Sequence, residues 1–123
     1  MRSSDFRVIA SPTLIGDGAS SSFAVSDLLP YEWLNVLARV DVEPGATVTF
    51  TAEISHDNSE WFTVYVHNLA AAAVKNTQAA SVSVNADGSL ALLGISVYAP
   101  HVRITAASAG AAATVSLYGI TVG

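Results

Sequence analysis

Strict alternation of apolar and polar residues constrains the fold of this chain more than any other feature. In the stretch WLNVLARVDV, residues 33–42, one phase is wholly apolar, with Leu34, Val36, Ala38, Val40 and Val42. Successive side chains of a β-strand point to opposite faces, so a period of two predicts a strand with one buried face. The other phase is mixed and carries Trp33, Asn35, Leu37, Arg39 and Asp41.

The same pattern recurs at residues 47–55, 61–67, 101–107 and 113–122. Glu-Pro-Gly at 43–45 predicts a turn after the first strand. The segment HDNSE, 56–60, predicts a hairpin between the next two. The shared inward phase predicts a core that includes Val48, Phe50, Ile54, Phe62, Val64, Val102, Ile104, Val115 and Leu117.

Other segments are less regular. The alanine-rich segment 68–80 lacks an amphipathic stripe, so a short helix and an extended crossing loop both remain open. The sequence NADGS, 85–89, predicts a turn. Gly119 lies where the apolar phase of the last strand changes, which predicts a β-bulge. Residues 1–30 contain two short strand-like stretches and a Gly/Ser-rich loop, and could form an irregular N-terminal arm.

Short strands separated by closely spaced turns predict an all-β fold. We expect an antiparallel β-sandwich or jelly roll of about eight strands. A chain of 123 residues with no evident repeat or linker is expected to form a single domain over residues 1–123.

The composition restricts the function. The chain has no cysteine, which excludes disulfides and thiolate chemistry. Five basic residues without a basic stripe argue against nucleic-acid binding. No apolar stretch suggests membrane insertion or a signal peptide. Only 12% of the residues are charged, while 51% are hydrophobic, which predicts apolar surface covered by other subunits.

His56, Asp57 and Glu60 are the only cluster that suggests a metal or catalytic site. They lack the spacing of zinc ligands and the dense acidic loop of strong calcium sites. Asp and Asn are common turn residues, so we interpret the cluster as the polar tip of a hairpin. No nucleophile elbow is present. We therefore expect no enzyme, no catalytic residue, no metal site and no cofactor.

Aromatic and aliphatic residues on the outward phase are better candidates for a functional surface. Such side chains could anchor a protein interface or stack on a sugar ring, or they could be packed under a loop. The candidate interface residues are Tyr31, Trp33, Leu37, Trp61 and Tyr65.

Residues 48–64, VTFTAEISHDNSEWFTV, resemble small virion proteins of tailed phages. These proteins combine a strand, a hairpin with Asp and Asn or Gly, and a Trp that opens the next strand. The likeness extends over residues 31–123, although Asn58 stands where a glycine is usual. Discoidin-like and carbohydrate-binding sandwiches share this layout.

The resemblance implies a structural protein of the virion, made in the host cytoplasm. The expected type is a capsid decoration (cement), head-fibre or tail-associated protein. A decoration protein would stabilise the shell by burying surface between capsid subunits. Its partners would be the major capsid protein or other virion subunits, and it would be a homo-oligomer, with a trimer among the options. The alternative is a carbohydrate-binding or adhesin-type module of a phage tail or fibre.

Overall fold

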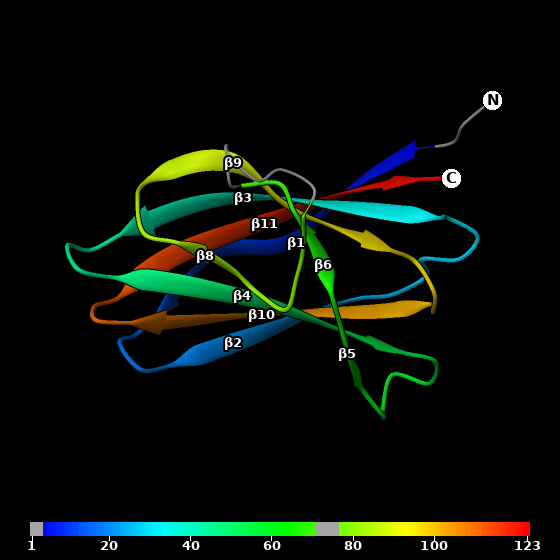
Figure 1. Cartoon of the computed structure of the whole chain (residues 1–123), viewed down its shortest axis with the longest axis horizontal. Helices are drawn as coiled ribbons and strands as arrows, with labels where there is room; N and C mark the ends of the chain where they lie inside the picture. Colours follow the sequence, from blue (N-terminus) through cyan, green and yellow to red (C-terminus); the bar gives the residue numbers. More distant parts are fainter. Residues whose placement is uncertain (1–3, 71–76) are drawn as a thin grey trace.

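The computed structural model describes residues 4–70 and 77–123, and these residues form eleven β-strands and no helix (Figure 1). The prediction of an all-β fold is therefore confirmed. The strands are β1 (Ser4–Ile15), β2 (Ser20–Val25), β3 (Trp33–Val42), β4 (Thr47–Ser55), β5 (Phe62–Val64), β6 (Val66–Asn68), β7 (Thr77–Ala79), β8 (Val82–Val84), β9 (Gly88–Ser96), β10 (His101–Ala109) and β11 (Ala113–Val122).

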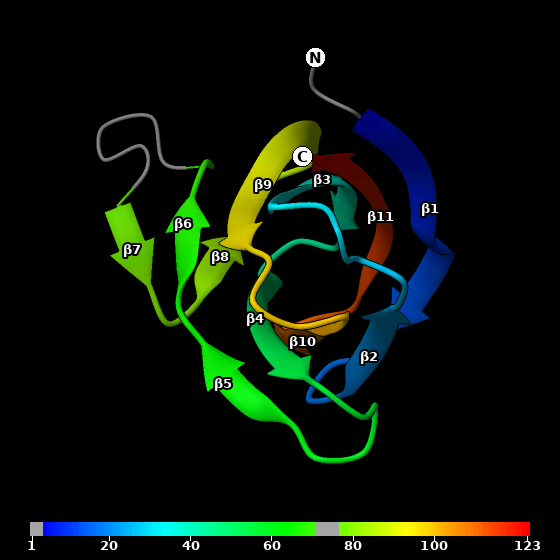
Figure 2. The ribbon, with the colours of Figure 1, turned by 90° about the vertical axis from the view of Figure 1, so that its right-hand side faces the viewer.

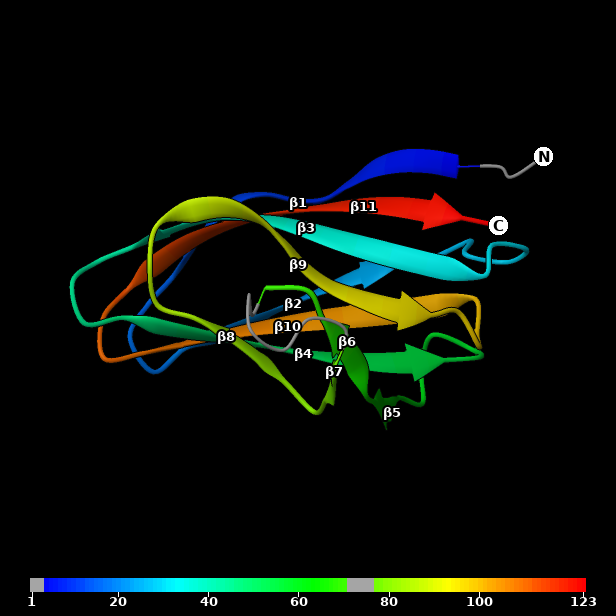
Figure 3. The same ribbon diagram turned by 45° about the horizontal axis from the view of Figure 1, so that its top comes forward.

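The strands form two antiparallel sheets that pack face to face (Figures 2 and 3). Sheet A has the order β1-β11-β3-β9-β6-β7, and sheet B has the order β2-β10-β4-β5. The short strands β5 and β8 pair with different halves of β4, so they share one strand position. With this position counted once, the chain has ten strand positions, six in sheet A and four in sheet B, which is more than the eight strands expected from the sequence.

Alternation along the long strands separates the core from the two outer faces. The inward residues of β3, β4, β10 and β11 are buried, as their shared phase predicts. Phe50 is one of the largest fully buried side chains and lies on β4 between β10 and β8. Glu43 accepts a hydrogen bond from the backbone of Ala46, and Gly45 has a φ of 90°, which confirms the turn after β3.

Phe62 was predicted in the core, and this prediction is wrong, because its side chain is 50% exposed. The strand β5 that carries it has only three residues and lies at the edge of sheet B. After Val64 the chain leaves this sheet, and it enters sheet A at Val66. Ile54 and Val64 are partly buried and pack against the core, while the other predicted core residues are fully buried.

The bulge predicted at Gly119 is absent from the pairing of β11 with β3, which runs without a register shift from Ala113 to Val122. The register shifts of sheet A lie in its partners, within β1 and between Val36 and Leu37 of the β3–β9 pair. A Cβ at Gly119 would lie 3.1 Å from the Cδ1 atoms of both Ile9 and Leu34. Glycine at 119 therefore provides room for core packing.

Residues 1–30 were predicted to form an irregular N-terminal arm, but most of them lie in two strands. Residues 4–15 form β1 along the whole of β11, and residues 20–25 form β2 beside β10. The segment 85–87 links the two sheets, since β8 pairs with β4 and β9 pairs with β3. Asp87 Oδ1 accepts a hydrogen bond from the backbone of Val42 across this link. Of the alanine-rich segment, residues 71–76 lie outside the described residues.

Candidate interaction surfaces

The tip of the β4–β5 hairpin is organised by Asp57. Its Oδ1 accepts hydrogen bonds from the backbone N–H groups of Ser59 and Glu60, both at 2.9 Å, and from the Ser55 hydroxyl at 3.0 Å. Asn58 has a φ of 61°, a conformation that asparagine tolerates in turns. The backbone bonds from Glu60 and Ser59 lower the pKa of Asp57 to about 2. The interpretation of this segment as a hairpin tip is therefore confirmed.

Metal-ligating side chains do not converge at this tip. His56 Nε2 lies 3.6 Å from Asp57 Oδ2, and both side chains are exposed. Over residues 4–70 and 77–123, no group of three or more His, Asp or Glu residues is placed to hold a metal ion. The two outer faces of the sandwich differ in their polarity.

The outer face of sheet B is lined by hydroxyl groups. Thr49 and Ser83 lie 3.1 Å apart across β4 and β8, and Ser22 and Thr105 lie 2.8 Å apart across β2 and β10. These cross-strand bonds satisfy polar groups and stabilise the strand pairing. They leave a face that is polar and carries little charge.

Trp61 packs against one ion pair on this polar face. Arg103 on β10 donates two hydrogen bonds to Glu53 Oε1 on β4, at 2.6 and 3.0 Å. Its guanidinium group also lies over the Trp61 ring, 4.5 Å from the ring centroid. A cation stacked in this way occupies one side of the indole ring. The contact between Trp61 and Arg103 thus packs the hairpin tip against sheet B.

The outer face of sheet A is apolar across three strands. Pairing places Val8 of β1 beside Tyr118 of β11, and Tyr118 beside Leu37 of β3. Phe6 lies beside Ile120 and stacks on Tyr118, with ring centroids 6.0 Å apart. Phe6 and Val8 are 60% and 58% exposed. We call these five residues the apolar face.

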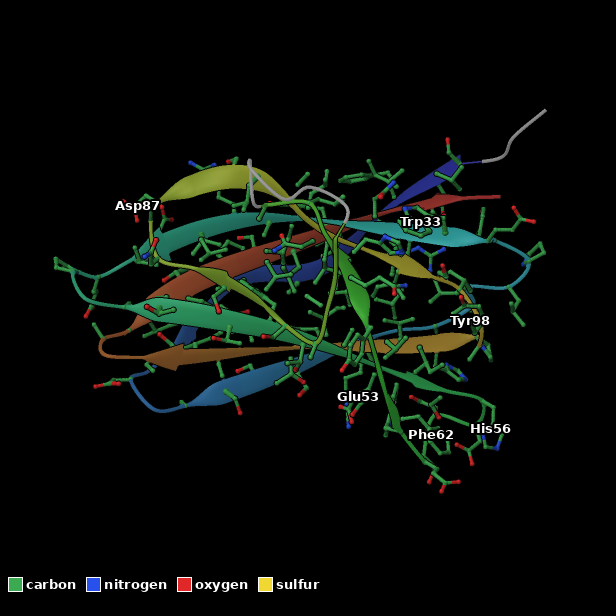
Figure 4. The ribbon with its side chains drawn as sticks, viewed as in Figure 1. Trp33, Glu53, His56, Phe62, Asp87 and Tyr98 are labelled. Atoms are coloured by element: carbon green, nitrogen blue, oxygen red, sulfur yellow. The ribbon has the colours of Figure 1, made fainter. Side chains whose placement is uncertain are left out.

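Trp33 lies farther along the same side of sheet A (Figure 4). Its indole covers Gly94 of β9, where any Cβ would overlap with the ring. The indole Nε1 donates to Asn35 Oδ1 at 2.5 Å, and the His67 ring packs edge-on at 5.0 Å. A hollow of about 520 Å³ beside this cluster is lined by Glu32, Trp33, Asn35, Val122 and Gly123.

The five candidate interface residues do not form one platform. Trp33 and Leu37 share the outer side of sheet A, whereas Trp61 stacks on Arg103 at the outer side of sheet B. Tyr31 is half-buried in the loop before β3, and Tyr65 is 62% exposed where the chain crosses between sheets. In Figure 4, Trp33 lies on sheet A, whereas Glu53, the ion-pair partner of the Arg103 that stacks on Trp61, lies on sheet B.

Sequence reasoning missed Phe6, Val8 and Tyr118 as surface residues. The alternation of Phe6, Val8 and the intervening Arg7 was the available signal, but a Gly/Ser-rich loop follows β1 and suggested an irregular arm. The most exposed aromatic side chain is that of Tyr98, 75% exposed in the β9–β10 loop. Its neighbours in sequence, Val97 to Pro100, show no alternation that could have indicated a strand or its face.

Comparisons with known proteins place the fold among phage and virus proteins. No protein-family model matches the chain, and no curated protein matches it in sequence. Among solved structures, the SPBc2 prophage-derived protein YomS is similar over the whole of this chain and 96% of its own length, with a TM-score of 0.67 and 12% identity. The PBSX exported protein XepA is similar over 97% of this chain and 37% of its own, with a TM-score of 0.63 and 16% identity.

A viral particle protein shares the fold as well. A chain of the T13 particle of infectious bursal disease virus is similar over 98% of this chain and 31% of its own length, with a TM-score of 0.53 and 9% identity. The chain thus spans about a third of XepA and of this viral protein. The expected β-sandwich fold is thus shared with a prophage-derived protein and with a viral particle protein. Within the described residues, no helix has the length and apolar character needed to cross a membrane.

Proposed function

We propose that this protein is a structural component of a phage particle and acts as a capsid decoration (cement) protein. The apolar face of sheet A is the observation that carries the proposal. Exposed Phe6 and Val8 lie beside Tyr118, Leu37 and Ile120 on three neighbouring strands, without a covering segment among the described residues. Contiguous apolar surface of this kind marks interaction sites in soluble proteins.

The surroundings of this face suit a protein partner. Arg39 and Asp41 continue the outward side of β3 and are exposed, so they would form a charged rim beside the apolar centre. An apolar centre with a polar rim is the usual anatomy of a protein interface. The major capsid protein, or another virion subunit, is the partner that the shared fold supports.

The proposed action requires binding alone. A subunit that binds only the assembled shell stabilises that shell by mass action. No catalysis, metal or cofactor enters this role, and few surface charges are available to make it depend on salt. The protein would be made in the host cytoplasm and would reside in the virion, where several copies would act together.

Binding to undecorated capsids tests the proposal. We expect saturating, symmetric occupancy by cryo-electron microscopy, lost in the Leu37→Glu variant. Thr51→Glu is the matched control, because Thr51 also points outward from a central strand but lies on sheet B. Capsids that bind neither wild type nor control, or that bind Leu37→Glu as tightly as wild type, would contradict the proposal.

A carbohydrate-binding role is the second candidate, and the hollow beside Trp33 favours it. An indole ring next to the polar groups of Asn35 and Glu32 is a combination that can hold a sugar ring. A glycan array would reveal binding that is lost in Trp33→Ala and kept in Trp61→Ala. Such a result, together with no affinity for capsids, would select this function over decoration.

A further inference from the structure

One of the two edges of sheet A is formed by β1, a strand of twelve residues that pairs with β11 on one side only, and we call it the free edge. Figure 2 shows β1 at the margin of the sandwich, with no strand beyond it among the described residues. The half of β1 after Val8 contains two register shifts and Pro12, which hinder further pairing. The half from Ser4 to Val8 is regular.

In this regular half, alternate residues have backbone N–H and C=O groups that point away from β11. The carbonyl of Asp5 accepts a hydrogen bond from the Thr121 hydroxyl of β11, at 3.3 Å. Backbone groups of successive residues point to opposite sides of a strand in an antiparallel ladder. Because Asp5 faces β11, the N–H and C=O groups of Ser4, Phe6 and Val8 face the free edge.

We propose that two copies of this chain pair through β1, antiparallel and with Phe6 opposite Phe6 of the second copy. In this register Ser4 lies opposite Val8, and Asp5 lies opposite Arg7. The two-fold symmetry then forms each of these contacts twice, as an isologous interface requires. The proposal concerns the free protein in solution and does not depend on binding to a capsid.

Charge selects this register over its neighbours. Pairing centred on Asp5 would place two carboxylates directly opposite each other, and pairing centred on Arg7 would do the same with two guanidinium groups. Like charges opposite each other in a sheet destabilise pairing, and opposite charges favour it. Arg7 already donates to Asp5 and to the Ser26 carbonyl within its own chain, yet its buried Nε has no acceptor among the described residues. In the dimer, Asp5 of the second copy would bring a second carboxylate next to Arg7.

The exposed aromatic side chain on β1 supports the same arrangement. Phe6 is 60% exposed and stacks on Tyr118. Directly opposite residues in antiparallel strands have Cβ atoms about 5 Å apart, so the two Phe6 rings would meet at the two-fold axis. The edge strand β2 of sheet B lacks these features, because its outward side chains are Ser20, Ser22 and Ala24.

A pair of charge reversals tests the proposed register. The Asp5→Arg variant carries two positive charges at the edge, and the Arg7→Asp variant carries two negative ones. We expect wild type to shift with concentration from 12.7 kDa to twice that mass in sedimentation equilibrium. Concentrations should extend to about 1 mM, because an interface this small binds weakly. Each variant alone should remain a monomer, and an equal mixture should form a mixed dimer.

Further variants separate pairing from folding. Circular dichroism identifies any charge-reversed chain that fails to fold, and Phe6→Lys then replaces it, because Phe6 is exposed and the change places two lysines at the axis. Leu14→Lys is the control, since Leu14 is 69% exposed on the same strand beyond the regular half. A monomeric wild type, a dimer that persists in the folded single variants, or a mixture that stays monomeric would overturn the proposal.

Discussion

Replacing two phenylalanines with alanine offers a direct test of the core. Phe50 is fully buried on β4, whereas Phe62 is 50% exposed on the short edge strand β5. Phe50→Ala would leave a cavity between β10 and β8, where Phe50 pairs with Ala106 and Val82. Burial and cavity terms together predict a loss of about 3–5 kcal/mol in the free energy of unfolding.

Phe62→Ala should cost much less. Complete burial of a phenylalanine contributes about 1.5–3 kcal/mol, and about half of this side chain is already in water. Solvent also fills the space that the ring leaves, so no cavity term applies. The expected loss is about 1 kcal/mol, which is small against a total stability of roughly 5–15 kcal/mol.

Urea denaturation followed by the fluorescence of Trp33 and Trp61 measures both losses. With a slope near 2 kcal/mol per molar urea, the midpoint should fall by about 2 M for Phe50→Ala and about 0.5 M for Phe62→Ala. Circular dichroism should give the same midpoints, since a single domain of this size usually unfolds in one step. Equal shifts for the two variants, or a larger one for Phe62→Ala, would refute the assignment of these residues to core and edge.

Two more perturbations address local features. The pKa of Asp57 is lowered to about 2 in the folded chain, so its stabilising contribution is present above the unfolded value near 4 and is lost as the pH falls toward 2. Thermal unfolding of Asp57→Asn should therefore change less between pH 4 and pH 2 than that of wild type, and an identical slope would argue against the Asp57 bonds. Gly94→Ala should displace the Trp33 indole, shift its emission and cost about 1–3 kcal/mol. Gly88→Ala, where a Cβ meets nothing within 4 Å, is the matched control, and equal effects of the two changes would contradict the packing of Trp33 on Gly94.

The sequence was sufficient to predict β3, β4, β10 and β11, because each has one buried face. Residues 33–42 alternate without interruption, and the inward side chains of Leu34, Val36 and Val40 are all fully buried. The hairpin tip could also be predicted, since Asp57 acts through bonds to residues two and three positions away. Both signals lie within a single strand or turn, so they can be interpreted without knowing which strands pair.

The remaining errors concern features that depend on distant residues. Phe62 keeps the inward phase of its strand, but it is exposed because β5 is the last strand at that edge among the described residues. The residues before Gly16 look irregular in sequence, yet pairing with β11 at the other end of the chain makes them a strand. The grouping of Phe6 with Tyr118 follows from that pairing, so alternation within one strand could not show that these two side chains meet.

The proposed dimer and capsid interfaces share Phe6 and Val8, but each also has residues of its own, which allow the two proposals to be tested against each other. Leu37 lies on the apolar face, while Asp5 and Arg7 lie at the free edge of the same sheet. Edge pairing would join the apolar faces of two copies into one surface, so both could engage a repeating shell together. Bivalent binding commonly exceeds single-site affinity by about 10²-fold or more. Asp5→Arg should therefore weaken capsid binding by roughly that factor without abolishing it, and adding Arg7→Asp chains should restore it. If Asp5→Arg binds capsids as tightly as wild type while remaining a monomer, the edge plays no part in decoration. If Leu37→Glu still forms the dimer but loses the capsid, edge pairing without an intact apolar face is not sufficient for decoration.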